Sequence, residues 1–157
     1  MMFWKKLMKK KQKIQGKKVV CVSGGFDPIH IGHVRMILDA AKFGAVIVIA
    51  NSDEWLIRKK GYVFMPFEER QEILYAIKGV VDVLQAKDDD DTVCESLKRI
   101  DPHIFANGGD RGDRNTPEME VCKQLEIQMI WGMGGNDKPQ SSSWLIDAIK
   151  NQVEKNK

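Results

Sequence analysis

The residues best suited to chemistry are two histidines, His30 and His33, that follow a pair of glycines at the start of an expected helix. Residues three apart near the start of a helix share one face. Gly24 and Gly25 allow the backbone to approach a ligand closely, because no Cβ is in the way. A helix N-terminus presents free N–H groups and a partial positive charge, which suit phosphate. These residue types together predict a site for phosphate chemistry.

The segments around the histidines predict a strand, a glycine loop and a helix. The apolar run at residues 19–22 indicates a buried strand, and apolar residues recur at helical spacing over residues 34–41. A second run at residues 45–50 is apolar at every position, as in a parallel strand covered on both faces. Ligands of open parallel sheets bind at the carboxyl ends of the strands. The glycine loop should therefore lie at that edge.

The same alternation of strand and helix continues along the chain. Further strands are expected at residues 80–84, 103–106 and 127–131, and further helices at residues 66–77, 92–100, 115–125 and 144–153. This order predicts an α/β fold with a Rossmann-like, mostly parallel five-stranded sheet and helices on both faces. A length of 157 residues fits one such domain, expected at residues 18–157 after a basic extension at residues 1–17.

The glycine–histidine segment fits three alternative kinds of site less well. A dinucleotide-binding fingerprint would need glycine where Phe26 and Ile29 stand, and the chain contains no P-loop motif. A zinc site built from Cys21, His30 and His33 would place one ligand inside the strand, and no fourth ligand is suitably spaced. A purely structural role as helix caps is a further alternative, although histidine is not a preferred cap.

Residues 24–33, G-G-F-D-P-I-H-I-G-H, closely resemble the H-x-G-H signature of the cytidylyltransferase-like nucleotidyltransferases. That family includes glycerol-3-phosphate, phosphocholine and phosphoethanolamine cytidylyltransferases. It also includes adenylyltransferases acting on heptose 1-phosphate, pantetheine phosphate and nicotinamide mononucleotide. Class I aminoacyl-tRNA synthetases share the motif, but this chain is far shorter and lacks K-M-S-K-S. The resemblance spans roughly residues 19–150 and implies nucleotidyl transfer from a nucleoside triphosphate to a small phosphorylated metabolite, with release of pyrophosphate.

The resemblance also implies roles for individual residues. His30 and His33 would donate hydrogen bonds to the transferring and leaving phosphates. Lys59 or Lys60 and the arginine of a P-x-E-x-R pattern, Arg70, would neutralise negative charge. From residue types alone, residues 58–61 would be an exposed basic turn and Arg70 a surface ion-pair partner. The residues expected to contact the nucleotide are Gly24, Gly25, Phe26, Asp27, Gly32, Asn107, Gly109, Asp110, Lys138, Ser141, Ser142 and Ser143.

The serine segment departs in part from the family pattern, in which the last helix begins R-T-x-G-I-S-T-T or similar. Residues 141–143 supply the serines, but the arginine and the G-I pair are missing. Lys138 would replace the arginine without its bidentate fork. Serines at a helix start are also ordinary N-caps. Mg²⁺ is expected as cofactor, bound through the nucleotide's phosphate oxygens, with no dedicated metal site in the protein.

The nucleotide and the acceptor stay open at this point. A free-standing domain resembles glycerol-3-phosphate cytidylyltransferase and slightly favours CTP. The turn at residues 51–53, the pattern at residues 66–70 and the loop at residues 108–110 equally resemble heptose 1-phosphate adenylyltransferase, which would use ATP. A non-catalytic nucleotide-binding domain is the remaining alternative, and the full set of basic residues and histidines argues against it. The resemblance also implies a homodimer.

The distribution of charge along the chain limits the kinds of partner that the protein could bind. Residues 1–18 carry eight of the 25 lysine and arginine residues and none of the 22 acidic residues, so the rest of the chain has five more acids than bases. An acidic body argues against a nucleic-acid binder. Residues 1–17, which include Phe3 and Trp4, would be a solvated tail or would make weak contact with an anionic membrane surface.

No segment has the 18 uninterrupted apolar residues typical of a membrane span. The three cysteines, Cys21, Cys94 and Cys122, fall within expected strands or helices and suggest free thiols in a reducing compartment. No secretory signal pattern is visible. These features predict a cytoplasmic protein.

Overall fold

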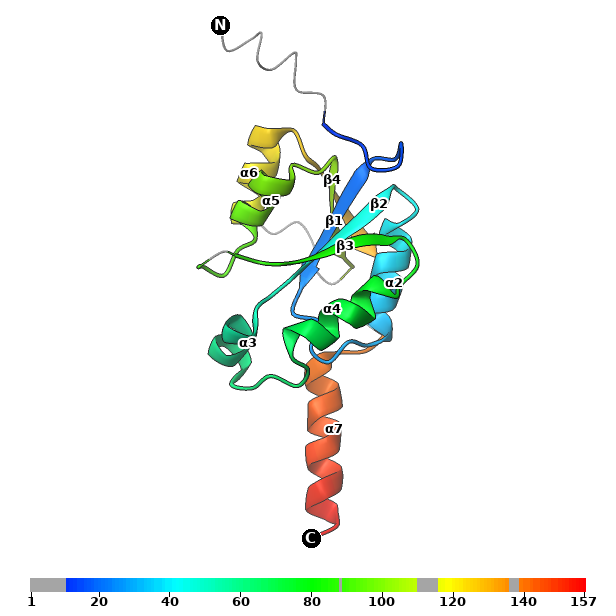
Figure 1. Ribbon diagram of the computed structural model, residues 1–157. Coiled ribbons are helices and arrows are strands. Elements are labelled where there is room, and N and C mark those ends of the chain that lie inside the picture. Colours follow the sequence, from blue (N-terminus) through cyan, green and yellow to red (C-terminus); the bar gives the residue numbers. More distant parts are fainter. Residues whose placement is uncertain (1–10, 88, 110–115, 136–138) are drawn as a thin grey trace, which may run out of the picture.

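The computed structural model describes residues 11–87, 89–109, 116–135 and 139–157. Its five strands form one sheet in the order β3-β2-β1-β4-β5, and every pair of neighbours is parallel (Figure 1). The strands are β1 (Val19–Gly24), β2 (Ala45–Ala50), β3 (Val80–Gln85), β4 (Ile104–Gly108) and β5 (Gln128–Met133). The described helices are α2 (Ile31–Ala40), α3 (Asp53–Lys60), α4 (Phe67–Tyr75), α5 (Cys94–Ile100), α6 (Pro117–Leu125) and α7 (Ser142–Lys155). The predicted Rossmann-like α/β fold is confirmed.

Successive side chains of β1 enter two different hydrophobic clusters. Val20 and Val22 pack with Ile37 of α2 and Leu74 of α4. Cys21 packs instead with residues of α5 and α6, among them Leu97. Helices therefore cover both faces of the sheet, as Figure 1 shows. All six residues of β2 are buried, which is the burial that its unbroken apolar sequence predicted.

Helix α3 is the main element that the sequence prediction missed. The residues expected as a basic turn form its last turn, and the helix ends at Gly61, whose φ is 83°. Ser52 caps its start by accepting a hydrogen bond from Trp55 N at 3.1 Å. A serine before two acidic residues and a glycine after a basic turn were thus readable helix signals. The apolar pattern was too weak to reveal the helix, because Leu56 is its single buried residue.

The described part of the predicted N-terminal extension makes contacts with the body of the molecule. Ile14 forms a β-bridge with Lys17 and packs against the second hydrophobic cluster. Lys11 Nζ lies 3.1 Å from Asp101 Oδ1 and donates to Pro102 O at 2.6 Å. Residues 11–17 thus contact the body, and the domain boundary predicted after residue 17 stays a prediction. Residues 1–10 lie outside the described part of the chain.

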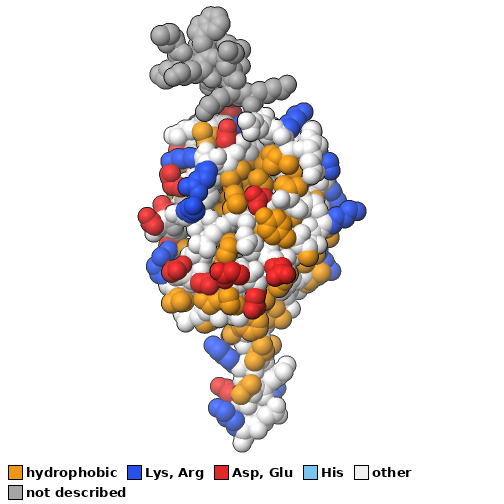
Figure 2. All heavy atoms as spheres, in the orientation of Figure 1, with side chains coloured by type: hydrophobic (Ala, Val, Ile, Leu, Met, Phe, Trp, Pro, Cys, Tyr) orange, Lys and Arg blue, Asp and Glu red, His pale blue; other side chains and the backbone are white. Residues whose placement is uncertain are grey.

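Helix α7 leaves the body of the molecule and carries the chain to its C-terminus (Figure 1). Its first turn is tied to the body, because Ser142 Oγ donates to Pro28 O at 2.9 Å. In Figure 2, hydrophobic side chains continue from the edge of the body onto this helix, and Ile149 and Val153 are exposed on it. None of the described helices has the length and apolar character needed to cross a bilayer.

Candidate active site

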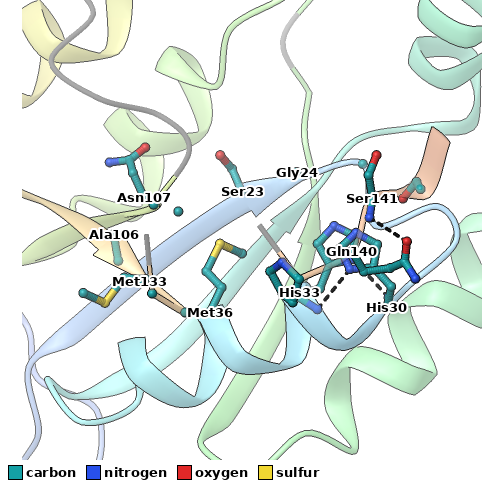
Figure 3. Close-up of a pocket in the computed structure, with 18 of the residues that line it drawn as sticks. Ser23, Gly24, His30, His33, Met36, Ala106, Asn107, Met133, Gln140 and Ser141 are labelled. Atoms are coloured by element: carbon teal, nitrogen blue, oxygen red, sulfur yellow. Dashed lines mark hydrogen bonds between the residues drawn. The ribbon is translucent and has the colours of Figure 1, made fainter. Parts of the chain in front are cut away.

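A pocket of about 360 Å³ opens where the carboxyl ends of β1, β4 and β5 meet the first turns of α2 and α7 (Figure 3). Its wall includes residues 23–25, 106–109, 133–135 and 139–143, together with His30, Gly32, His33, Met36 and Lys60. These segments lie far apart in the sequence, and the parallel sheet brings them to one edge. The pocket thus lies at the sheet edge where ligand binding was expected.

The two histidines form a capping box at the start of α2. His30 is the N-cap residue, and its Nδ1 accepts a hydrogen bond from Gly32 N at 3.0 Å. His33 Nδ1 accepts in turn from His30 N at 3.2 Å, and the two rings stack with centroids 3.8 Å apart. The expectation that histidines do not suit a cap is therefore wrong. They cap the helix and line the pocket at the same time.

The capping box fixes which ring nitrogen of His33 carries the proton. Since Nδ1 accepts from a backbone N–H, the neutral ring must hold its proton on Nε2. Burial, together with His30 and Lys60 nearby, lowers the pKa of His33 to about 3. His33 therefore stays neutral near pH 7. It is suited to donating an Nε2–H hydrogen bond and unsuited to acting as a general acid.

The position of the His30 ring explains the glycine of the H-x-G-H motif. A Cβ added to Gly32 would lie 2.9 Å from His30 Cε1 and 3.0 Å from His30 Nδ1. Contacts this short would push the ring away and break its hydrogen bond to the Gly32 amide. Gly32 is therefore needed to hold His30 at the wall of the pocket.

The structure separates the two lysines at the end of α3. Lys60 lines the pocket, and its Nζ lies 3.5 Å from the carbonyl oxygen of Asp27. Partial burial lowers the pKa of Lys60, although the Asp27 carboxylate opposes the shift. Lys59 instead pairs with Asp91, with 2.6 Å between Lys59 Nζ and Asp91 Oδ2. Lys60 is thus the lysine placed to contact a ligand in the pocket.

Arg70 is fully buried behind the pocket wall, where its guanidinium group donates hydrogen bonds to three backbone carbonyl oxygens and one carboxylate. Its Nη1 donates to Gly25 O and to Asn51 O, both at 2.8 Å. Its Nη2 contacts Asp53 Oδ1 at 2.7 Å, and its Nε donates to Met65 O at 2.9 Å. The interpretation as a surface ion-pair partner is wrong. Arg70 ties the glycine loop to the end of β2, so it positions the site instead of facing a ligand.

Phe26 and Asp27, both expected at the nucleotide, are buried beneath the loop. The Phe26 ring packs edge-on against His33, with ring centroids 4.9 Å apart. The Asp27 carboxylate accepts from Phe64 N at 2.7 Å and from Met65 N at 2.6 Å. Both side chains therefore shape the loop from behind, and neither belongs to the described pocket wall.

Most of the other expected nucleotide contacts do line the pocket. Gly24, Gly25, Gly32, Asn107 and Gly109 are all part of the wall. The Asn107 side-chain amide bridges two strands, because it donates to carbonyl oxygens of β4 and β5 at 3.4 Å each. The residues expected at positions 110 and 138, Asp110 and Lys138, lie outside the described part of the chain.

The serine side chains at the start of α7 make contacts other than capping hydrogen bonds. Ser141 is the N-cap residue, but its side chain makes no capping hydrogen bond. Its Oγ lies 2.8 Å from Ser143 Oγ, and both residues line the pocket. Ser142 also lines the pocket, while its hydroxyl anchors the helix to the loop after β1. The hydroxyls of Ser141 and Ser143 are thus held next to each other at the pocket.

Several wall residues were missed by the sequence reasoning. In Figure 3, Met133 of β5 lies with Ala106 and Asn107 at the end of the pocket away from His30, and Met36 of α2 lies between Met133 and His33. Gln140 also lines the wall and accepts from Ser141 N at 3.0 Å. Methionines at helical or strand spacing indicate core packing equally well, so no sequence signal could have singled them out.

The zinc alternative does not fit the geometry. Cys21 packs with Cys122 in the cluster beneath α5 and α6, whereas α2, which carries His33, covers the opposite face. Burial raises the pKa of the Cys122 thiol to about 11 and that of Cys21 further still. Both thiols are therefore protonated core groups.

Residues 21–135 match the family model described as cytidylyltransferase-like. The chain belongs to the cytidylyltransferase-like family. Among its relatives, the bifunctional protein HldE of Sulfurimonas denitrificans is 35% identical over 122 residues, which are 75% of this chain and 25% of that protein. The bifunctional protein HldE of Pelobacter propionicus is 35% identical over 117 residues, or 73% and 23% of the two chains. The chain thus spans about a quarter of the length of the curated relatives it matches.

The fold of this family member also occurs among solved structures. A lipopolysaccharide core biosynthesis protein from Thermoplasma volcanium superposes with a TM-score of 0.59 at 20% identity, covering 74% of this chain and 96% of that one. A protein from Archaeoglobus fulgidus gives a TM-score of 0.51 at 18% identity, covering 78% and 95%. These two similarities support the architecture of the family domain.

Proposed function

We propose that this protein is a nucleotidyltransferase that moves a nucleoside monophosphate group from a nucleoside triphosphate to a small phosphorylated acceptor. The observation that carries the proposal is the convergence of His33 Nε2–H, the Lys60 amine and the Ser141 and Ser143 hydroxyls on one pocket. Such groups bind and stabilise phosphate oxygens. Membership of the cytidylyltransferase-like family supports the same reaction class.

In the proposed reaction, a phosphate oxygen of the acceptor attacks the α-phosphorus of the nucleotide. A new P–O bond forms, the bond between the α-phosphorus and the bridging oxygen breaks, and pyrophosphate leaves. An anionic phosphate is already a nucleophile, so no general base is required. The protein contributes positioning and charge stabilisation. A neutral His33 that donates through Nε2 fits this role.

Mg²⁺ stays a proposed cofactor that would neutralise charge on the triphosphate. The described part of the pocket wall presents imidazoles, hydroxyls, amides and one lysine, and it includes no carboxylate. Magnesium in such a site would be held mainly by the phosphate oxygens of the nucleotide. Ser141 and Ser143 are the described residues that would add hydroxyl ligands or hydrogen bonds.

A sugar phosphate is the first candidate acceptor, paired with ATP. The sequence resembles heptose 1-phosphate adenylyltransferases at residues 51–53, 66–70 and 108–110. The relatives of this chain include HldE proteins that are 35% identical to it. On this support ATP is proposed ahead of CTP, which the sequence analysis slightly favoured. CTP with glycerol 3-phosphate is the second candidate pair.

The proposal is tested by pyrophosphate release in the presence of Mg²⁺, with ATP and CTP each offered against a panel of acceptors. The panel holds heptose and other sugar 1-phosphates, glycerol 3-phosphate, phosphocholine and phosphoethanolamine. Turnover with ATP and a sugar 1-phosphate is expected. Tight nucleotide binding without pyrophosphate release from any pair would instead favour a non-catalytic nucleotide-binding domain.

The two neighbouring lysines offer a matched pair of variants. Lys60→Met should lower kcat/KM for the nucleotide by on the order of 10- to 100-fold, because one charge contact to phosphate is lost. Lys59→Met removes the same charge one residue away and breaks only the exposed pair with Asp91, so kcat/KM should change less than about two-fold. Steady-state kinetics on both variants check this. A larger loss for Lys59→Met would reverse the assignment.

The homodimer implied by the family resemblance and the cytoplasmic location both stay predictions. Sedimentation equilibrium of the purified chain measures the first directly. Fractionation of cells expressing the tagged chain measures the second.

A further inference from the structure

The end of β5 forms part of the pocket wall, and the sheet supports it on one side only. β5 is the last strand in the sheet order, so β4 is its single strand neighbour among the described residues. The pairing of these two strands shifts register between Ala106 and Gly108, and Gly108 pairs with Met133. The sheet is therefore irregular at the point where Met133 lines the pocket.

The turn around Met133 is rich in glycine. Gly132, Gly134 and Gly135 have φ values of 81°, 83° and 92°, in the left-handed region that glycine adopts readily. A hydrogen bond from Gly135 N to Gly132 O at 3.1 Å closes the turn. Because glycine loses more conformational entropy than other residues when it is fixed, contacts from outside the turn are needed to hold it in one shape.

Asp39 of α2 supplies such a contact. Its Oδ2 accepts a hydrogen bond from Gly134 N at 2.7 Å, across 95 residues of sequence. The turn also lies directly against α2, because a Cβ added to Gly134 would be 3.1 Å from Met36 N and 3.3 Å from Met36 Cα. Asp39 Oδ1 pairs with the exposed Lys42 at 2.9 Å. The hydrogen bonds from Lys42 and then from Gly134 lower the pKa of Asp39, so the group that accepts near pH 7 is a carboxylate.

The contact between Asp39 and the turn relates two methionines of the pocket wall to each other. Met36 comes three residues before Asp39, so both lie on the same side of α2, and Met133 comes just before the glycine that Asp39 holds. In Figure 3, Met36 lies between His33 and Met133. A thioether has no N–H or O–H to donate to a phosphate, so this end of the pocket suits an apolar part of a ligand.

We propose that Asp39 is a positioning residue, which holds the turn at residues 132–135 against α2 and so keeps Met36 and Met133 at the separation that the nucleoside part of the nucleotide requires. The inference rests on the proposed nucleotidyl transfer, because it takes a nucleoside triphosphate to be the ligand of the pocket. Asp39 itself is not among the described residues of the pocket wall. Its replacement should therefore weaken contacts to the nucleoside and leave phosphate recognition unchanged.

The test is calorimetric titration of the full chain with ATP, CTP and inorganic tripolyphosphate, each with Mg²⁺. Asp39→Ala should bind the preferred nucleotide on the order of 10-fold more weakly, because a charge-assisted hydrogen bond that orders the wall is lost. Its affinity for tripolyphosphate, which has no nucleoside part, should change less than about two-fold, since sites without shared contacts are nearly independent. Asp39→Asn keeps an oxygen that can accept from Gly134 N, so its nucleotide affinity should stay within about three-fold of wild type.

Lys42→Ala is the matched control, because it removes the exposed partner of Asp39 and leaves the hydrogen bond to Gly134 in place. Its nucleotide affinity should stay within about two-fold of wild type. Asp39 and Lys42 lie outside both hydrophobic clusters, so all three variants should fold.

Three outcomes would overturn the positioning role while leaving the proposed function standing. They are wild-type nucleotide affinity in Asp39→Ala, an equal loss of affinity for tripolyphosphate in that variant, and an equal loss of nucleotide affinity in Lys42→Ala. The second of these would mean that the whole domain loosens. A wild-type chain that binds neither ATP nor CTP would instead contradict the proposed function, and this inference with it.

Discussion

Replacing His33 with alanine should lower kcat for nucleotidyl transfer by on the order of 100-fold or more, the usual cost of losing one preorganised transition-state donor. The His33 ring is held by the His30 amide on one side and by stacking on the other, so its Nε2–H is aimed before any substrate binds. Steady-state kinetics with the active nucleotide–acceptor pair measure the effect. Turnover close to that of wild type would remove His33 from the mechanism.

The alanine change also breaks the capping box, so a second variant must separate catalysis from helix capping. Glutamate is a standard partner at the third helical position of a capping box, because its side-chain oxygen can accept from the N-cap amide, and the ionised carboxylate has no N–H to donate to a phosphate. His33→Glu should therefore unfold in urea closer to the wild-type midpoint than His33→Ala does, yet lose at least as much activity. If activity instead followed stability across both variants, His33 would be a cap alone.

The fold could be predicted from the sequence because local patterns and global topology agree. The unbroken apolar run of β2 is explained only by burial on both faces, and the glycine–histidine segment lies between a strand and a helix. The elements that the sequence analysis did not predict are short and bury few residues. Helix α3 buries Leu56 alone, and the turn closed by Ile14 and Lys17 contributes one partly buried side chain.

The sequence motifs predicted which segments form the site, but not which of their side chains face the pocket. Residues on the H-x-G-H segment and the serine segment do meet at one pocket. A motif does not say which side of the wall a residue occupies, however. Asp27 and Lys60 are both polar residues near the glycine loop, but one is buried against backbone amides and the other lines the pocket. That difference depends on packing between distant segments, which no local spacing encodes.

The buried guanidinium of Arg70 is the clearest case of such packing, and its removal should be the most damaging single change to stability. Arg70→Met keeps much of the side-chain volume but leaves the carbonyl oxygens of Gly25 and Asn51 without their donor. It also leaves Asp53 without its ion-pair partner. The expected loss is about 3–5 kcal/mol in the free energy of unfolding, because breaking a buried charge network leaves several polar groups without hydrogen-bond partners.

Urea denaturation of Arg70→Met against Arg99→Met measures this loss. Arg99 is exposed at the end of α5, so its replacement should change the free energy of unfolding by about 0.5 kcal/mol or less.

If Arg70 positions the pocket wall, its replacement should also lower activity in the folded protein. At temperatures where Arg70→Met remains folded, its kcat should still be reduced, because Gly25 is no longer tied to the end of β2. An Arg70→Met protein with wild-type stability would contradict the network, and full activity in the folded variant would show that the glycine loop holds its shape without the arginine.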